Sequence, residues 1–136
     1  ALTALIREKG MPNAVIAPLS AKGELCLFSN VPTDVIVDIN GWFLSNTGFT
    51  AVTPARVFDS RAGQSPNALV GIPKQKYGGN SGILQVNVAN LRGATPATGI
   101  GAVSLNVTVT NPDAALLTAW LEGRQMSPTY AMGFLR

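Results

Sequence analysis

The chain has 136 residues and a formal net charge of +3, with 46% hydrophobic and only 12% charged residues. This length suits one domain with one core, no apolar run is long enough for a membrane span, and the ten Lys and Arg residues are too scattered to predict nucleic-acid binding. The chain has no histidine, which excludes His-dependent catalytic triads and imidazole-ligated zinc sites within it.

The low charged fraction means that polar neutral residues must cover much of the surface. Thr, Asn, Ser and Gln do this on β-sheets and in secreted proteins, whereas cytosolic helical domains rely on Lys and Glu. The composition therefore favours a β-rich protein that is extracellular or on the cell surface.

The first thirty residues predict two strands around a turn. Residues 1–10 form a short helix or the tail of a strand, because their apolar spacing is helix-like but the segment is short. Residues 14–19 predict a strand that Pro18 confines to a strand end or a sheet edge. Residues 20–23 then predict a hairpin turn, followed by a returning strand at 24–29.

The only cysteine, Cys26, lies in this returning strand. A single cysteine cannot form a disulfide within the chain, and no histidine is present to activate it as a thiolate. We therefore expect Cys26 to be a small buried hydrophobic residue.

Residues 34–43 alternate with a period of two, which is typical of a half-buried strand. If Gly41 does not break the register, one face carries Val35, Val37, Ile39 and Phe43. The opposite face then carries Asp34, Ile36, Asp38, Asn40 and Trp42.

Three residues of that second face, Asp34, Asp38 and Asn40, carry oxygen atoms of the kind that bind calcium. However, residues two apart on a strand diverge by roughly 6.5–7 Å, whereas calcium needs oxygens that converge from loops. We therefore expect these residues to serve turns and strand edges, and no metal or cofactor to be bound.

Residues 49–61 predict an extended segment that Pro54 interrupts, which suits an edge strand or a crossing between sheets. Residues 62–82 are rich in Gly, Pro, Ser and Asn and form the longest predicted loop. If the chain presents a segment for binding, this loop is the first candidate.

The C-terminal half predicts further strands. Residues 83–88 place Leu84, Val86 and Val88 on one side, and residues 102–110 alternate most regularly, with Val103, Leu105, Val107 and Val109 inward. Residues 115–121 and 129–135 predict two more strands.

These eight or nine short strands, separated by turn residues and without a convincing helix, predict an all-β fold. We expect one antiparallel β-sandwich module over residues 1–136, with a jelly-roll-like arrangement or a barrel as alternatives.

One tight cluster of opposite charges follows Pro54, namely Arg56, Asp59 and Arg61. On an ideal strand Asp59 and Arg61 share a face and Arg56 lies on the other. An Arg–carboxylate fork would lock this segment, so the cluster, together with Asp38 and Pro54, is interpreted as a structural joint. The alternative is that an arginine here binds an anion or a sugar.

Four aromatic residues, Trp42, Tyr77, Trp120 and Tyr130, could together form a stacking surface for sugars. Tryptophans of all-β modules also serve as core residues. The candidate ligand-binding residues are therefore Trp42, Arg56, Trp120 and Tyr130. The seven carboxylates form no recognisable acid–base pair, and we expect no enzymatic activity.

Three motifs of the chain, SNVPTDVIVDINGWF, TPARVFDSR and GAVSLNVTVTNP, resemble a tandem repeat found in secreted and cell-surface proteins of actinobacteria. In that repeat the motifs read roughly S-N-x-x-T-D-V-I-V-D-x-x-G-(Y/W)-F, T-P-x-R-(L/V)-(L/F)-D-(T/S)-R and V-x-L-N-V-T-V-T-x-P. The resemblance implies a β-rich extracellular module, often repeated or appended to secreted hydrolases, without a defined activity of its own.

The chain departs from the repeat in two ways. The LNVTVTNP segment follows the strand of Cys26 instead of preceding it, so the chain resembles one repeat length in a cyclically shifted frame. The repeat also often carries a cysteine that would pair with the one at Cys26, where this chain has Leu121-Glu122-Gly123, so the resemblance implies no disulfide here.

We therefore expect a non-enzymatic structural or adhesive module. Its shifted frame predicts either a circularly closed domain or a subunit whose open strand edges are completed by neighbouring repeats in a filament or array. The alternative is a module that binds cell-wall glycan or another polysaccharide and is appended to a secreted enzyme.

Overall fold

The computed structural model describes residues 2–5, 12–29, 32–45, 48–79, 83–110 and 116–121, and these residues form eight strands without an α-helix. The strands are β1 (Leu2–Leu5), β2 (Pro12–Pro18), β3 (Glu24–Ser29), β4 (Asp34–Leu44), β5 (Phe49–Asp59), β6 (Leu84–Asn87), β7 (Ile100–Thr110) and β8 (Leu116–Leu121). Side chains are described for the six strands β2 to β7. The all-β prediction is confirmed.

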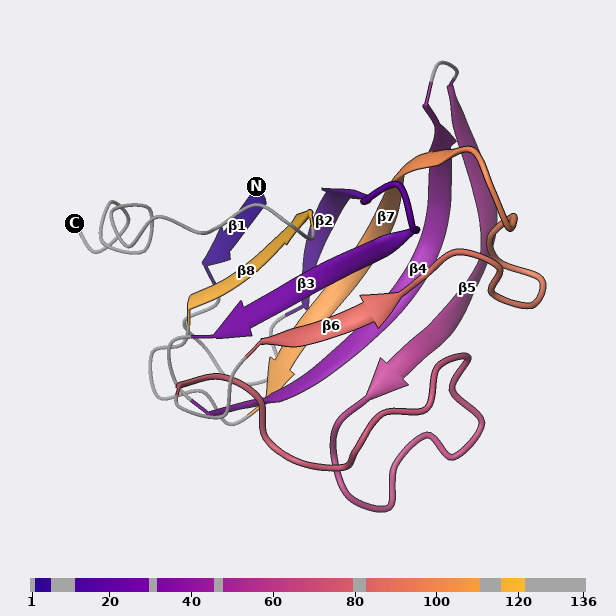
Figure 1. The fold of residues 1–136 in the computed structure, drawn as a ribbon. Helices are drawn as coiled ribbons and strands as arrows, with labels where there is room; N and C mark the ends of the chain where they lie inside the picture. Colours follow the sequence, from indigo (N-terminus) through magenta and orange to yellow (C-terminus); the bar gives the residue numbers. More distant parts are fainter. Residues whose placement is uncertain are drawn as a thin grey trace.

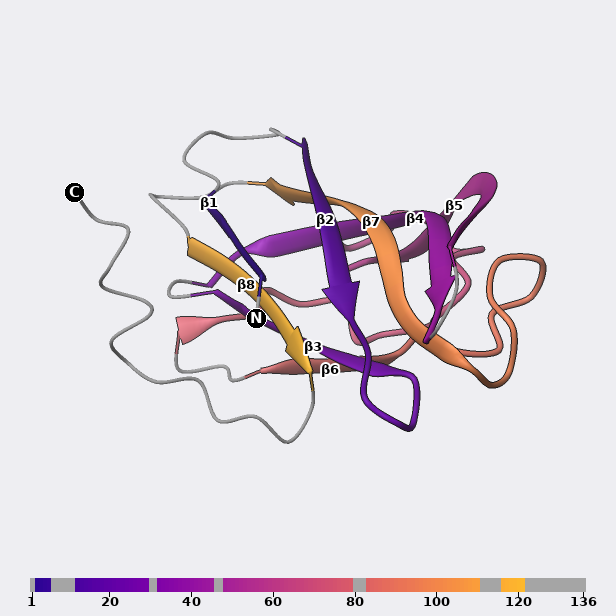
Figure 2. The ribbon, with the colours of Figure 1, turned by 90° about the horizontal axis from the view of Figure 1, so that it is seen from above.

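The strands form two antiparallel four-stranded sheets, which we name sheet A (β1-β8-β3-β6) and sheet B (β2-β7-β4-β5). Strands β3 and β6 lie in front of β7 and β4 in Figure 1, and Figure 2 shows the same strands from above. Neither sheet closes on itself, because each has two edge strands. The barrel alternative is therefore wrong.

One buried hydrophobic cluster draws side chains from both sheets. Along β7 its members alternate with polar, half-buried residues, as expected of a strand with one buried face. Sheet A contributes Leu25, Leu27, Leu84 and Val86. Sheet B contributes Val15, Val35, Val37, Ile39, Val103, Leu105, Val107 and Val109.

The turn after β2 does not make a hairpin, which corrects the prediction for residues 20–29. The turn itself is present: the backbone N–H of Gly23 donates to the carbonyl of Ser20 at 2.9 Å, and Gly23 has a φ of 76°. However, β2 pairs with β7 in sheet B, whereas β3 pairs with β6 and β8 in sheet A. The turn residues determine that the chain reverses here, but they do not determine which strands β3 pairs with.

Strand β4 changes face near its middle, which corrects the predicted faces of two aromatic residues. Ile39 pairs with Leu105 and Gly41 with Ser104, so Asn40 is an extra residue in β4. Directly opposed residues point to the same face, and Trp42 pairs with the buried Val103.

Trp42 therefore packs against the core, and Phe43 turns to the outer face of sheet B. There its ring contacts that of Phe49, with 5.1 Å between the ring centroids.

Strand β5 is an edge strand, as Pro54 indicates, and it does not cross between sheets. Ala51 pairs with Gly41 and Ala55 with Ile39, so Pro54 lies in a bulge between these pairs. A proline, which has no N–H to donate, is tolerated at such a position.

A glycine comparison tests the tight turn between the two sheets. A Cβ at Gly23 would lie 2.3 Å from the Cβ of Ala89, whereas a Cβ at Gly63, which has a similar φ of 69°, would meet nothing within 4 Å. We expect Gly23→Ala to lower the free energy of unfolding by about 2–4 kcal/mol and Gly63→Ala by about 1 kcal/mol. Urea unfolding measures both, and equal losses would contradict the described close packing of this turn.

Candidate functional site

The charged residues that stand out in the sequence meet on the outer face of sheet B. Asp38 on β4 pairs with Arg56 on β5, and Ile36 pairs with Asp59. Val37 pairs with Phe58, which leaves Val57 as an extra residue in β5. An ideal strand would place Arg56 and Asp59 on opposite faces, but this bulge brings Arg56 to the side of Asp59.

The carboxylate of Asp59 has no exposed surface and is surrounded by donors. Arg61 forms a fork with it: Nε donates to Oδ1 at 3.0 Å and Nη2 donates to Oδ2 at 2.7 Å. The backbone N–H of Arg61 donates to Oδ1 at 3.1 Å, Nη1 of Arg56 donates to Oδ2 at 3.1 Å and the hydroxyl of Ser65 donates to Oδ2 at 3.2 Å. A buried charge is tolerated when it is paired in this way.

Arg56 links this carboxylate to the centre of the sheet. Its Nε donates to Oδ1 of Asp38, and its Nη1 donates to the hydroxyl of Ser65 at 3.0 Å. We name Asp38, Arg56, Asp59, Arg61 and Ser65 the Asp59 cluster. Both arginine side chains of the cluster are about one-third exposed, at 35% for Arg56 and 36% for Arg61.

The segment after β5 folds back over the edge of sheet B and is tied to it. Leu69 N–H donates to the carbonyl of Arg56 at 3.0 Å and Val70 N–H to that of Val57 at 2.8 Å. The ammonium of Lys74 donates to the carbonyls of Asp59 and Gln64. We name residues 61–79 the strap, because they cover part of the β5 edge.

The far end of the strap is fixed by Tyr77. Its backbone N–H and carbonyl exchange hydrogen bonds with Thr33 at 2.8 and 2.9 Å, and its hydroxyl donates to the carbonyl of Pro73 at 2.9 Å. Tyr77 is buried, and this burial raises the pKa of its phenol. The strap contains residues 62–79 of the predicted 62–82 loop, and it is held on the body of the protein at both ends.

Burial acts to raise the pKa of Asp59, but the hydrogen bonds and positive charge of Arg61, together with the Ser65 hydrogen bond, outweigh it and hold this pKa at about 2. The pairing with Asp59 in turn raises the pKa of Arg61. A general acid or base works best with a pKa near the working pH. Asp59 is therefore a permanent anion that suits a structural ion pair.

The aromatic candidates are not brought together among the described side chains. Trp42 packs against the core and Tyr77 is buried beside Thr33. Trp120 lies on β8, where its backbone pairs with that of Cys26, and Tyr130 lies outside the described residues. Cys26 itself is buried, as predicted.

The acidic residues considered as calcium ligands already have partners. Asp34 accepts from the hydroxyl of Ser60 at 3.2 Å, and Asp38 accepts from Arg56. In the described part of the chain, no three acidic or cysteine side chains gather in a way that could hold a metal ion.

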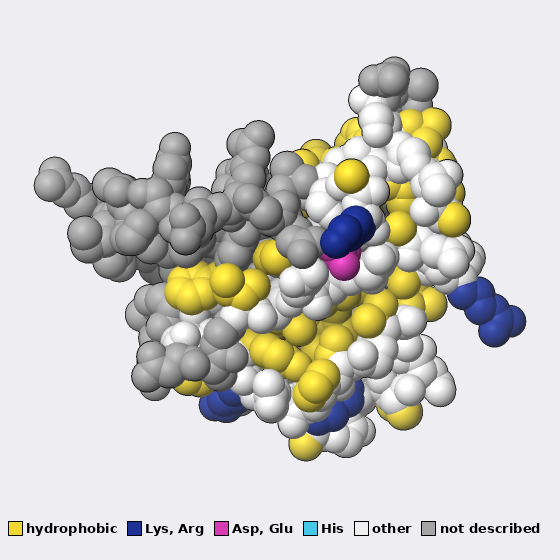
Figure 3. All heavy atoms as spheres, viewed as in Figure 1, with side chains coloured by type: hydrophobic (Ala, Val, Ile, Leu, Met, Phe, Trp, Pro, Cys, Tyr) yellow, Lys and Arg dark blue, Asp and Glu magenta, His cyan; other side chains and the backbone are white. Residues whose placement is uncertain are grey.

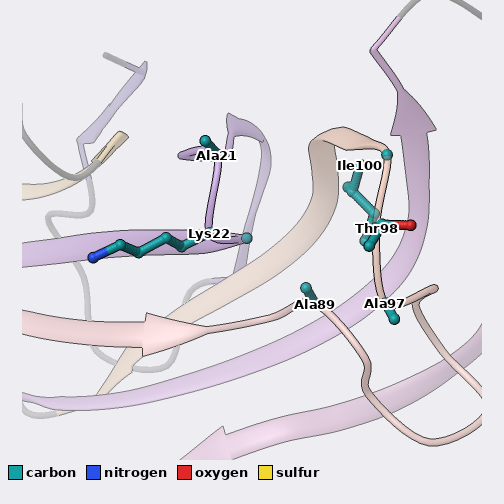
Figure 4. Close-up of a pocket in the computed structure, with 8 residues that line it drawn as sticks. Ala21, Lys22, Ala89, Ala97, Thr98 and Ile100 are labelled. Atoms are coloured by element: carbon teal, nitrogen blue, oxygen red, sulfur yellow. The ribbon is translucent and has the colours of Figure 1, made fainter.

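A pocket of about 260 Å³ lies between the β2–β3 turn and the start of β7. Lys22, Thr98 and Ile100 line it together with five small residues. The small residues are Ala21, Gly23, Ala89, Ala97 and Gly99. The Lys22 side chain extends away from Thr98 and Ile100 (Figure 4). The pocket therefore has space but no converging polar side chains that would select a ligand.

Comparison with known proteins gives no matching family model, no matching curated protein and no matching solved structure. The resemblance to the actinobacterial repeat therefore stays a prediction. Within the described residues, no helix has the length and apolar character needed to cross a bilayer.

The Asp59 cluster predicts a large loss of stability in Asp59→Asn, because two arginines and Ser65 lose their charged acceptor. We expect the free energy of unfolding to fall by about 3–5 kcal/mol, and by about 1 kcal/mol or less in Asp38→Asn, whose side chain is 26% exposed and pairs with Arg56. Chemical denaturation measures both values. An Asp59→Asn variant with an unchanged free energy of unfolding would show that the Asp59 cluster does not stabilise the fold.

The low pKa of Asp59 predicts acid sensitivity. Its carboxyl has an ordinary pKa of 3.8 in the unfolded chain and about 2 in the folded one. The stability it provides is therefore complete above pH 3.8 and is lost as the pH falls through 2, about 2 kcal/mol in all. Melting temperatures between pH 5 and pH 2 should fall more steeply for the wild type than for Asp59→Asn, and parallel curves would contradict this.

Proposed function

We propose that the chain is a non-enzymatic structural or adhesive module that acts outside the cell or on its surface, by association with neighbouring modules. One observation carries the proposal: the carboxylate of Asp59 is satisfied by donors of the Asp59 cluster itself, and the cluster fastens the strap. A catalytic or ligand-binding cluster would instead leave a charged group directed toward a substrate.

We further propose that the module is a β-sandwich of the jelly-roll type. Each strand of the first half pairs with a strand of the second half in inverse order: β1 with β8, β2 with β7, β3 with β6 and β4 with β5. This is the pairing of one long hairpin that is rolled up into two four-stranded sheets, as in a jelly roll. The buried cluster shared by both sheets supports the same proposal.

The β1–β8 pairing also supports the circularly closed version of the predicted domain. Leu2 pairs with Ala119 and Leu5 with Leu116, so the first described strand is completed by the last described one. In this version the module keeps its own strands together and meets its neighbours through outward-facing side chains.

The low charge supports an extracellular location, since few Lys, Arg, Asp and Glu side chains lie on the face drawn in Figure 3, where other polar and hydrophobic groups prevail. Fractionation of the source organism tests this. We expect the chain in the secreted or cell-wall fraction, and recovery from the cytoplasm would contradict the proposal.

Activity and binding assays separate the structural module from its alternatives. We expect the purified chain to hydrolyse no member of a polysaccharide and peptide panel and to stay unbound on a glycan array and in a cell-wall pull-down. Saturable glycan binding would favour the carbohydrate-binding alternative. Turnover that disappears in Asp59→Asn while the melting temperature stays unchanged would instead indicate an enzyme.

A further inference from the structure

The outer face of sheet B is divided into two unlike halves. The register places its outward residues in rows that cross all four strands. One row contains Asp38 and Arg56, and the next contains Asp59. Two further rows lie beyond Asp38, and their apolar members are Ile16, Pro18, Phe43, Phe49, Ala51 and Ala102. We name these six residues the outer patch.

The outer patch is exposed. Ile16 on β2 retains 54% of its surface and Phe49 on β5 retains 51%. The ring of Phe49 lies over Gly41, because a Cβ at Gly41 would come within 2.1 Å of that ring. The large side chains of the patch thus come from three strands, with Ile16 on β2, Phe43 on β4 and Phe49 on β5.

The segments that build the outer patch contain no charged residue. Residues 10–21, 39–55 and 93–112 have no Asp, Glu, Lys or Arg, although the whole chain has a net charge of +3. Two copies can therefore bring this face together without repulsion between like charges and without stripping water from an ion. An acidic, basic or nucleic-acid partner would find no charge to recognise there.

The edges of sheet B are less suited to association than its face. Pro12 and Pro18, which have no N–H to donate, stand at the two ends of β2. The strap covers β5 at Arg56 and Val57, and Pro54 interrupts the rest of that strand. Both edge strands, β2 and β5, are thus poorly suited to pairing with a strand from another molecule.

We propose that the outer patch binds a second copy of this chain, face to face. This inference rests on the proposed structural function and names its partner and surface. A two-fold axis parallel to the strands keeps the apolar rows opposite each other and places β2 of one copy over β5 of the other. Ile16 of each copy then packs against Ala51 and Phe49 of its partner.

The size of the outer patch sets the strength of the dimer. Four strands about 4.8 Å apart and two rows about 7 Å apart cover on the order of 300 Å², whereas each partner in a standard interface buries roughly 800 Å². The patch is therefore the apolar centre of a weak interface, and we expect the dimer to have a dissociation constant in the micromolar range or above.

Sedimentation velocity from about 1 µM to about 1 mM tests the dimer. We expect the wild type to shift from monomer to dimer and Ile16→Lys to dimerise at least about tenfold more weakly. The matched control is Ile83→Lys, because Ile83 is 56% exposed but lies outside sheet B. It should behave as the wild type, and all three proteins should unfold at similar temperatures.

A cross-linking experiment tests the orientation, in a Cys26→Ala background. A mixture of Ile16→Cys and Ala51→Cys chains should form more disulfide-linked dimer than either chain alone. Equal yields would overturn the proposed axis.

The proposed dimer surface is wrong if the wild type stays monomeric to about 1 mM. It is also wrong if Ile83→Lys weakens dimerisation as much as Ile16→Lys does. Glycan or vesicle binding by a monomeric wild type that Ile16→Lys abolishes would assign the patch to that partner instead. A wild type that stays monomeric and binds nothing overturns the dimer alone. Glycan binding would also favour the carbohydrate-binding alternative, and hydrolytic turnover by the chain would overturn the proposed function.

Discussion

The buried charge of Asp59 is the constraint on which the surrounding structure depends. A carboxylate without exposed surface has to find its donors inside the fold. Arg61 lies only two residues further along the chain, but Arg56 reaches the same side only because Val57 is an extra residue in β5. Ser65 then draws the strap onto the sheet. One ion cluster thus links a bulge, an edge strand and the longest loop.

This cluster also gives sheet B its two unlike halves. Beside the strap the outer face carries the paired charges of the Asp59 cluster, whereas the rows beyond Asp38 carry no charged residue. A stable fold and an exposed apolar surface therefore coexist in one sheet, because the ion pairs stabilise one half and leave the other available. The proposed dimer uses the available half, so stability and association can be altered by separate substitutions such as Asp59→Asn and Ile16→Lys.

Much of the fold could be predicted from local patterns. The alternation in residues 102–110 identified both the strand β7 and its buried side, because period two is a property of the strand itself. Pro54 correctly indicated an edge strand. Members of the candidate site were also visible, since Arg56, Asp59 and Arg61 are close in sequence. Their arrangement could not be predicted from the sequence, because ideal alternation places Arg56 on the face opposite Asp59.

The sequence by itself determined which residues alternate, where the chain turns and which charges lie near one another, because these depend on neighbours a few positions apart. Only the tertiary structure decided that β2 and β3 belong to different sheets and that Asn40 and Val57 are extra residues. Pairing and register arise from strands distant in the chain, and one extra residue exchanges the two faces of everything beyond it. That exchange packed Trp42 against the core and placed Phe43 on the outer patch.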